Sequence, residues 1–402
     1  MKRGVDISLL FRGDKGIWAL VVLFMFYSLL AVYSSSVSVA FMSYGGNTTY
    51  FLRTQFLMLL FGLVIIVVTS HLSYRVLYLL ASLFLVVSLL LLVLTLFAGV
   101  RINEATRWLE IPGTGFRLQT SDIAKVALVI YLARVLSKYQ SNLRDFSLVT
   151  RVFVVPIALV CLLIMSENLS TAIMIFSICM VILFIGRVPL KFIAAYCGMA
   201  LLGVIFFAMA MALFTDDNRV QVWKARIEAF AAGDSYGGDD YQSNQAKIAV
   251  ATGGLTGKMP GKSVQRNMLP QSNSDFIFAI IVEEYGLLFG AIPLIMAYMA
   301  LLYRGIAIAR KCETAFPALL VLGLSVMIVS QAMLNMLVAV GLFPVTGQTL
   351  PLVSWGRTSV LVMSFSVGAI LGVSRVVKAK AGKEEVPDTE LHEIEDVAYE
   401  PA

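Results

Sequence analysis

The residues best suited to chemistry are one acid and several bases beside long apolar runs. Asp275 begins one such run, directly after Ser274. Ionisable side chains are costly at membrane depth, so each one there is a functional candidate. The bases predicted on the same, external side are Arg107, Lys125, Lys258, Lys262, Arg266 and Arg357. This mixture suits an anionic, phosphate-bearing substrate. We expect the cations to depress the pKa of Asp275, which makes it a poor base until a substrate or metal redistributes the charges.

A polar stretch from Gln119 to Lys125 precedes the fourth apolar run and includes Ser121 and Asp122. Lys125 and Asp122 are three residues apart and therefore share one helix face. Two interpretations are open: Lys125 contacts an anionic substrate, or the stretch is a helix cap with a local ion pair. Arg107, which precedes a Trp, is likewise either a substrate contact or part of an interfacial anchor.

Two adjacent acids, Glu283 and Glu284, follow Asp275 in the same apolar run. Asp275 also fits a plain capping role, because the positive end of a helix favours an acid. If the helix begins near Asp275, the glutamates lie about two turns into the membrane; a span formed by residues 285–302 alone leaves them at the interface. The sequence is compatible with both arrangements.

Irregular backbone is predicted at membrane depth between Gly341 and Pro351, because this stretch contains two prolines and two glycines. Such backbone is tolerated only when it is buried in protein or lines a wet cavity. Arg357, just beyond it, favours the cavity. A second glycine-rich stretch, Gly253 to Lys258, is suited to contact phosphates. It is not a Walker loop, because the spacing differs and no strand precedes it.

The composition places these residues in a membrane protein. Of 402 residues, 59% are apolar and only 14% are charged, against about 25% charged in ordinary soluble domains. A soluble enzyme is excluded, and runs such as 76–100 are too long for the strands of a β-barrel. Two histidines leave almost no material for a histidine metal site or triad. A net charge of +6 without basic, aromatic-rich runs predicts no nucleic-acid partner.

We therefore expect an all-α integral membrane protein of about ten transmembrane helices, with a large extracytoplasmic loop between helices 7 and 8. Basic residues concentrate in alternate short loops, which places both termini in the cytoplasm. The predicted domains are a cytoplasmic segment (1–15), a membrane domain (16–375) that includes the outer loop at about 215–274, and a disordered cytoplasmic tail (376–402). The predicted crossings are 16–35, 53–70, 75–99, 122–138, 149–165, 168–186, 190–214, 275–303, 316–340 and 351–374.

Two long stretches also carry a family resemblance. One runs from Tyr241 through Gly253–Gly257 to Ser274-Asp275-Phe276 and Glu283-Glu284-Tyr285-Gly286; the other is Gly341–Pro351 with Ser374-Arg375. On these motifs the chain resembles the SEDS glycosyltransferases (shape, elongation, division and sporulation), the family of FtsW and RodA. The resemblance covers about residues 12–375.

The resemblance implies a polymerase that joins lipid II into peptidoglycan glycan strands on the outer face of the cytoplasmic (inner) membrane. It implies a class B penicillin-binding protein and other divisome membrane proteins as partners. It also implies that Asp275 is the catalytic base and that a divalent cation, Mg or Mn, acts at Asp275. In this mechanism Asp275 takes the proton from the acceptor's 4-hydroxyl, which attacks the anomeric carbon of the growing chain with inversion. The predicted substrate-binding residues are Lys125, Arg107, Gln119, Ser121, Ser274, Lys258 and Arg357.

The sequence departs from the family pattern in places. The family's Gln-Pro-Ser-Glu is Gln119-Thr120-Ser121-Asp122 here, and Ser354-Trp355-Gly356-Arg357 stands where two glycines are commoner. Substrate contacts near Trp355 and Arg357 therefore stay open. The charged tail and residues 344–349 favour the division branch (FtsW-like) over a RodA-like elongation polymerase.

The main alternative from another class is a transporter that flips the lipid-linked precursor, because many helices with intramembrane charges fit it equally well. The two halves show no internal repeat, and the candidate residues cluster on the outer side instead of at the midplane, which favours the enzyme. A scaffold that only recruits partners would leave the charged cluster unexplained.

Overall fold

The computed structural model describes residues 11–37, 40–41, 47–102, 105–111, 113, 116–214, 238–269 and 272–380. Each predicted crossing corresponds to a helix or to helices in line. They are α2 (Lys15–Ser35), α4 (Thr48–His71), α5 (Tyr74–Ala98), α6 (Thr120–Lys138), α7 (Phe146–Val149) with η2 (Thr150–Val154) and α8 (Val155–Met165), α9 (Leu169–Ile185), α10 (Leu190–Phe214), α13 (Ile277–Gly286) with η4 (Leu287–Ala291) and α14 (Ile292–Ala309), α15 (Ala315–Ala339) and α16 (Arg357–Lys380).

Seven helices in the described ranges are long and apolar enough to span a membrane, and α9 and α10 supply shorter apolar helices. Helix α6 is not among them, because it carries Asp122, Lys125 and Arg134. Two of the spans are compound. Each contains a π-helical turn directly before a helix with proline in its first turn, as expected since proline lacks the N–H that continues the regular ladder.

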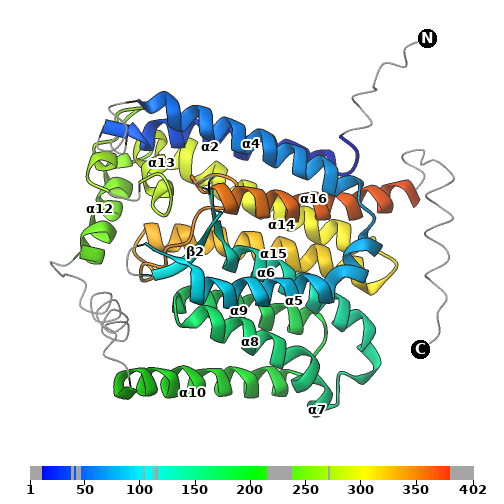
Figure 1. Ribbon diagram of the computed structural model, residues 1–402. Helices are drawn as coiled ribbons and strands as arrows, with labels where there is room; N and C mark the ends of the chain where they lie inside the picture. Colours follow the sequence, from blue (N-terminus) through cyan, green and yellow to red (C-terminus); the bar gives the residue numbers. More distant parts are fainter. Residues whose placement is uncertain are drawn as a thin grey trace, which may run out of the picture.

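The helices lie roughly side by side, with α4 at one edge of the bundle and α10 at the opposite edge (Figure 1). Helices α15 and α16 form the centre: 67% and 72% of their most apolar windows are buried, against 28% for α4 and α5. The apolar residues exposed on α4 and α5 lie on the outside of the bundle. This arrangement gives the site residues of α15 rigid neighbours on several sides.

A small antiparallel sheet departs from the all-α expectation. Strands β1 (Val100–Ile102), β2 (Ala105–Ile111) and β3 (Phe116–Gln119) pair in that order. Trp108 pairs with Gln119, and Glu110 pairs with Arg117 across β2 and β3. The predicted outer loop before the fourth helix is thus a sheet that ends directly in α6.

The last helix begins later than predicted. Residues 351–356 form turns instead of helix, and α16 starts at Arg357. Ser354 explains this locally, because its Oγ accepts from the Leu350 N–H at 2.7 Å and Leu352 adopts φ +64°. The irregular backbone predicted at 341–351 therefore extends to residue 356.

The outer loop contains one predicted helix. Tyr241 to Val250 lies within α12 (Gly238–Gly253), whereas the surface helix expected at 219–232 falls outside the described residues, as does the acidic tail from residue 381.

Candidate functional site

Asp275 ends the outer loop and stands two residues before α13. Its backbone carbonyl accepts from Asn335 Nδ2 of α15 at 2.7 Å. The two preceding carbonyls are also held by the turn before α16: Ser354 Oγ donates to the Ser274 carbonyl at 2.7 Å, and the Trp355 N–H donates to the Asn273 carbonyl at 2.9 Å. Three consecutive peptide units are thus fixed by neighbouring elements, while the Asp275 side chain stays partly accessible.

Arg107 and Asp275 flank the backbone of Gly347. A side-chain Cβ at residue 347 would lie 3.5 Å from Arg107 Nη1 and 3.7 Å from Asp275 Oδ2. Gly347 has φ +67°, a conformation that suits glycine. The Arg107 Nε donates to the Glu167 carbonyl at 3.0 Å, which ties strand β2 to the turn between α8 and α9. The sheet and the irregular segment therefore bring a cation to the acid.

The pKa of Asp275 differs from the expectation of a depressed value. Burial raises the pKa from 3.8 to about 6, while a hydrogen bond with Ser274 and the charge of Arg107 oppose the rise without cancelling it. Desolvation wins because a single nearby guanidinium compensates only part of the lost hydration. A carboxyl with a pKa near 6 is well matched to proton transfer near neutral pH.

Lys125 lies deeper than a surface substrate contact. Its side chain is 2% exposed, and its Nζ donates to Asp122 Oδ1 at 2.7 Å and to Gln331 Oε1 at 2.5 Å. The ion pair that the spacing allowed is therefore present. Gln331 continues the chain of contacts to the Thr349 carbonyl at 2.9 Å, so Lys125 reaches the irregular segment beside Asp275 through one amide.

Gln119 and Ser121 stand at the N-terminal end of α6, where Gln119 Nε2 donates to Ser121 Oγ at 3.3 Å. Ser121 lines a small cavity of about 20 Å³ together with Arg107, Glu167 and Asn168. This volume suits a single water. Arg357 is the first residue of α16, next to the turn that holds Ser274. Among the predicted contacts, Arg107, Ser274 and Asp275 are thus brought together directly.

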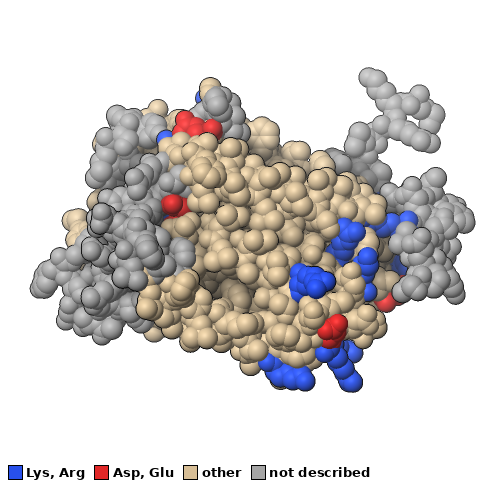
Figure 2. Space-filling view, turned by 60° about the horizontal axis from the view of Figure 1, so that its bottom comes forward, with Lys and Arg blue, Asp and Glu red and all other residues tan. Residues whose placement is uncertain are grey.

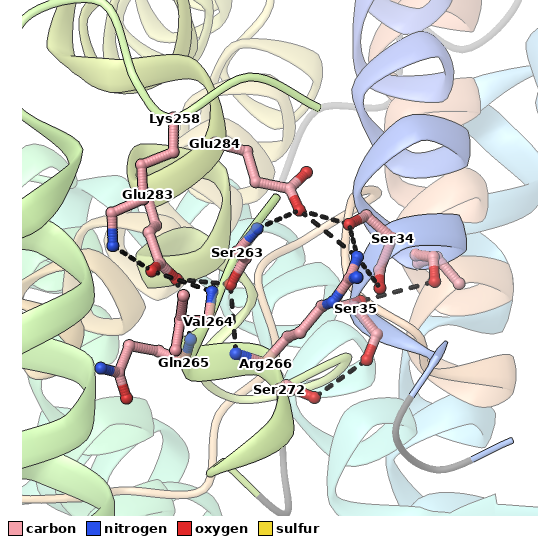
Figure 3. Close-up of polar contacts among 11 residues, drawn as sticks. Ser34, Ser35, Lys258, Ser263, Val264, Gln265, Arg266, Ser272, Glu283 and Glu284 are labelled. Atoms are coloured by element: carbon pink, nitrogen blue, oxygen red, sulfur yellow. Dashed lines mark hydrogen bonds and ion pairs between the residues drawn. The ribbon is translucent and has the colours of Figure 1, made fainter. Parts of the chain in front are cut away.

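Lys258 belongs to a separate cluster, which we call the glutamate clasp: Glu283, Glu284, Lys258, Ser263, Arg266 and Ser34 (Figure 3). Lys258 Nζ donates to Glu283 Oε1 at 2.7 Å. Glu283 also accepts from Ser263 Oγ and from the N–H groups of Val264 and Gln265 at 3.1 and 3.2 Å. Lys258, which was predicted to bind substrate, is thus paired with Glu283 in this structure.

The second acid of the clasp joins the outer loop to α2. Glu284 Oε1 accepts from Ser34 Oγ and lies 3.9 Å from Arg266 Nη1, which donates to Ser34 Oγ at 3.0 Å. The loop backbone packs directly on α13: a Cβ at Gly257 would lie 2.2 Å from the Glu284 carbonyl oxygen. The glutamates therefore lie two turns into the helix, covered by loop residues and not by lipid.

The described residues contain no group of three or more His, Cys, Asp or Glu side chains able to hold a metal ion. Asp275 has a guanidinium beside it, which disfavours a second cation. The described protein groups at Asp275 do not form a preformed divalent site. The predicted Mg or Mn at Asp275 stays a prediction.

Two buried amide side chains, Gln331 and Asn335, were not among the site residues predicted from the sequence. Gln331 and Asn335 are each 1% exposed on α15 and contact Lys125 and Asp275. The available signal was their spacing, since two amides four residues apart in an apolar run share one helix face at membrane depth.

Comparisons with known proteins agree with this fold. Residues 14–379 match the FtsW/RodA/SpoVE family of cell cycle proteins. A probable peptidoglycan glycosyltransferase FtsW from Thioalkalivibrio sulfidiphilus is 33% identical over 92% of this chain and 92% of its own. The corresponding protein of Trichlorobacter lovleyi is 32% identical over 91% of this chain and 94% of its own.

Solved structures show the same architecture. A chain from a structure described as a peptidoglycan synthase complex that coordinates polymerization and crosslinking is 24% identical, with a TM-score of 0.71, over 91% of this chain and 98% of its own. A mutant of the rod shape determining protein RodA from Thermus thermophilus is 25% identical, with a TM-score of 0.65, over 90% of this chain and 97% of its own. This multi-pass membrane protein therefore belongs to the FtsW/RodA/SpoVE family of cell cycle proteins.

Proposed function

We propose that this protein is a peptidoglycan glycosyltransferase that polymerises lipid II into glycan strands. The observation that carries the proposal is Asp275: a partly accessible carboxyl on a braced backbone, next to Arg107 and the bare backbone of Gly347. Relatives more than 30% identical over most of their length are named as probable enzymes of this class. A transfer from a lipid-linked diphosphate needs a base and an anion-stabilising cation, and this site holds one of each.

In the proposed reaction, ionised Asp275 accepts the proton of the acceptor 4-hydroxyl as that oxygen attacks the anomeric carbon. The configuration inverts because attack is direct. Arg107 stabilises the departing diphosphate through charge-assisted hydrogen bonds. Lys125 does not contact the substrate in this proposal. It holds Gln331, which in turn holds the Thr349 carbonyl in the segment that contains Gly347.

The proposed orientation has both termini in the cytoplasm and the sheet, α12 and Asp275 outside. Lys and Arg side chains gather at one end of the face seen in Figure 2, which supports a cytoplasmic end under the positive-inside rule. We propose a class B penicillin-binding protein as partner, septal synthesis as the role, and contacts with other divisome membrane proteins.

The test is polymerisation of purified lipid II by the detergent-solubilised protein, together with its cognate penicillin-binding protein and a divalent cation. Parental protein should form long strands and Asp275→Asn none. Asp145→Asn, which alters the exposed cap of α7, is the matched control and should retain activity. Transport of lipid II across liposomes without strand formation would replace this proposal with the transporter.

A further inference from the structure

The amides of Gln331 and Asn335 lie one helical turn apart on α15 and are both buried. Their positions follow from the 3.6-residue period, which places residues four apart on one face. That face meets the irregular segment before α16. Backbone without helix leaves its carbonyls unpaired, and at membrane depth such groups need donors from the protein. The two amides supply them.

Asn335 uses its amide nitrogen twice. Nδ2 donates to the Asp275 carbonyl at 2.7 Å and to the Gln348 carbonyl at 2.6 Å. An amide NH₂ has two N–H groups, so both donors are used. One side chain thus joins the backbone of Asp275 to that of Gln348, the residue after Gly347. This link holds the backbone of Gly347 beside the Asp275 carboxylate.

Gln331 supports the next carbonyl in the same segment. Its Nε2 donates to the Thr349 carbonyl at 2.9 Å, while its Oε1 accepts from buried Lys125. Gln348 is also held from the other side, where its Nε2 donates to Thr171 Oγ1 of α9 at 2.6 Å. Consecutive residues of the segment are therefore anchored to α15, α9 and, through Lys125, α6.

We propose that Asn335 is a positioning residue for glycosyl transfer, and that Gln331 assists it by coupling Lys125 to the Thr349 carbonyl. This inference rests on the proposed function. Asn335 touches none of the reacting atoms. It fixes the separation between the Asp275 backbone and the segment that carries Gly347, and thereby the place where the carboxylate meets Arg107. A simple filler of the core would need no donor directed at Asp275.

The geometry predicts an effect on turnover more than on binding. Misplacing a catalytic group by about 1 Å costs on the order of 100-fold in rate. Asn335→Leu keeps the volume and removes both donors, so kcat for strand synthesis should fall about 100-fold while KM stays within about threefold. Asn335→Gln keeps an amide donor on a longer stem and should recover part of kcat.

Ser325→Ala is the matched control. Ser325 is fully buried on the same helix, its Oγ has no hydrogen-bond partner in the described part of the chain, and it contributes nothing to the site. Its kcat should equal the parental value. Thermal denaturation of each variant in detergent reports whether any loss of activity follows loss of folded protein.

Gln331 offers a second, independent contrast. Gln331→Glu keeps the acceptor for Lys125 and loses the donor to Thr349, whereas Gln331→Met loses both. If the donor matters, both variants should lower kcat. Full kcat in Gln331→Glu would show that Gln331 acts only as the acceptor for Lys125, and would overturn the role of its donor.

The outcomes separate cleanly. A lowered kcat with retained KM in Asn335→Leu, partly recovered in Asn335→Gln, supports the inference. A kcat within threefold of the parent, or equal losses in both variants that track unfolding, overturns it. Absence of strands from the parental protein itself would instead reject the proposed function.

Discussion

Asp275 and the two glutamates of the clasp stand near the N-terminal end of the same helical span and have opposite surroundings. In the glutamate clasp, Glu283 is fully buried and accepts four hydrogen bonds, from Lys258, Ser263, Val264 and Gln265. Asp275 is partly accessible, and its neighbours leave its pKa raised.

The difference suggests a structural role for Glu283 and a chemical role for Asp275. A carboxylate whose lone pairs are filled by protein donors is held in one place and has nothing left for a substrate. A carboxyl that is only partly compensated is unstable as an anion and is ready to take a proton. From the residues alone, Asp275 also fitted a plain capping role, and the family resemblance is what implied that Asp275, and not the glutamates, is the catalytic base.

The largest expected effect is on activity at Asp275. Asp275→Asn should lower strand synthesis by about 10⁴-fold, the upper end of the range for a general base, while the protein still inserts and folds. Glycan length on gels, with lipid II as substrate, measures this. Near-parental synthesis would show that Asp275 has no role as base.

The next effect is on stability at Glu283. Glu283→Ala removes the acceptor of four hydrogen bonds and leaves Lys258 without its acid, so it should destabilise the protein by about 3 kcal/mol or more. The midpoint of thermal denaturation in detergent reports the loss. A variant as stable as the parent would mean that the clasp contributes no more than an exposed ion pair.

A pH series sharpens the same contrast. With a pKa of about 6, Asp275 should be active as the anion, so strand synthesis should fall as the pH drops through about 6. The effect on stability has the opposite sign. Because the folded-state pKa is raised, stability is greatest below the unfolded value of 3.8 and is lost as the pH rises towards 6.

Asp275→Asn tests that sign directly. The neutral amide avoids burying a charge, so the variant should be more stable than the parent at pH 7 by at most about 3 kcal/mol, with the difference vanishing near pH 4. Equal denaturation midpoints at both pH values would place Asp275 in an environment as well compensated as that of Glu283.

The smallest effect is expected at Lys258. Lys258→Met removes one donor of Glu283, but the Lys258 side chain is 31% exposed and three other donors remain. We expect a loss of about 1 kcal/mol and parental kcat. A large loss of kcat at unchanged stability would return Lys258 to the substrate-binding residues.

The helices and their order could be predicted from the sequence, because apolar runs of membrane length have few alternatives. The sheet at 100–119 could not, since short strands paired across a turn give a weak local signal. Ser274 and Asp275 were found through their motif. The pair of Lys125 with Asp122, three residues away, was one of the two interpretations drawn from their spacing. The pairing of Lys258 could not be predicted, because its acid, Glu283, lies 25 residues along the chain and such pairs are decided by tertiary packing.

The clasp also has a consequence for biogenesis. Acids within an inserting helix are costly, and α13 carries two in succession. Lys258, Ser263 and Arg266 precede α13 in the chain, so in the proposed orientation they are exported before α13 enters the membrane. In the proposed orientation the partners of the two glutamates are therefore already on the outer side when α13 is synthesised, and Ser34 of α2 is already in the first span. The partners of the glutamates are thus made before the glutamates themselves.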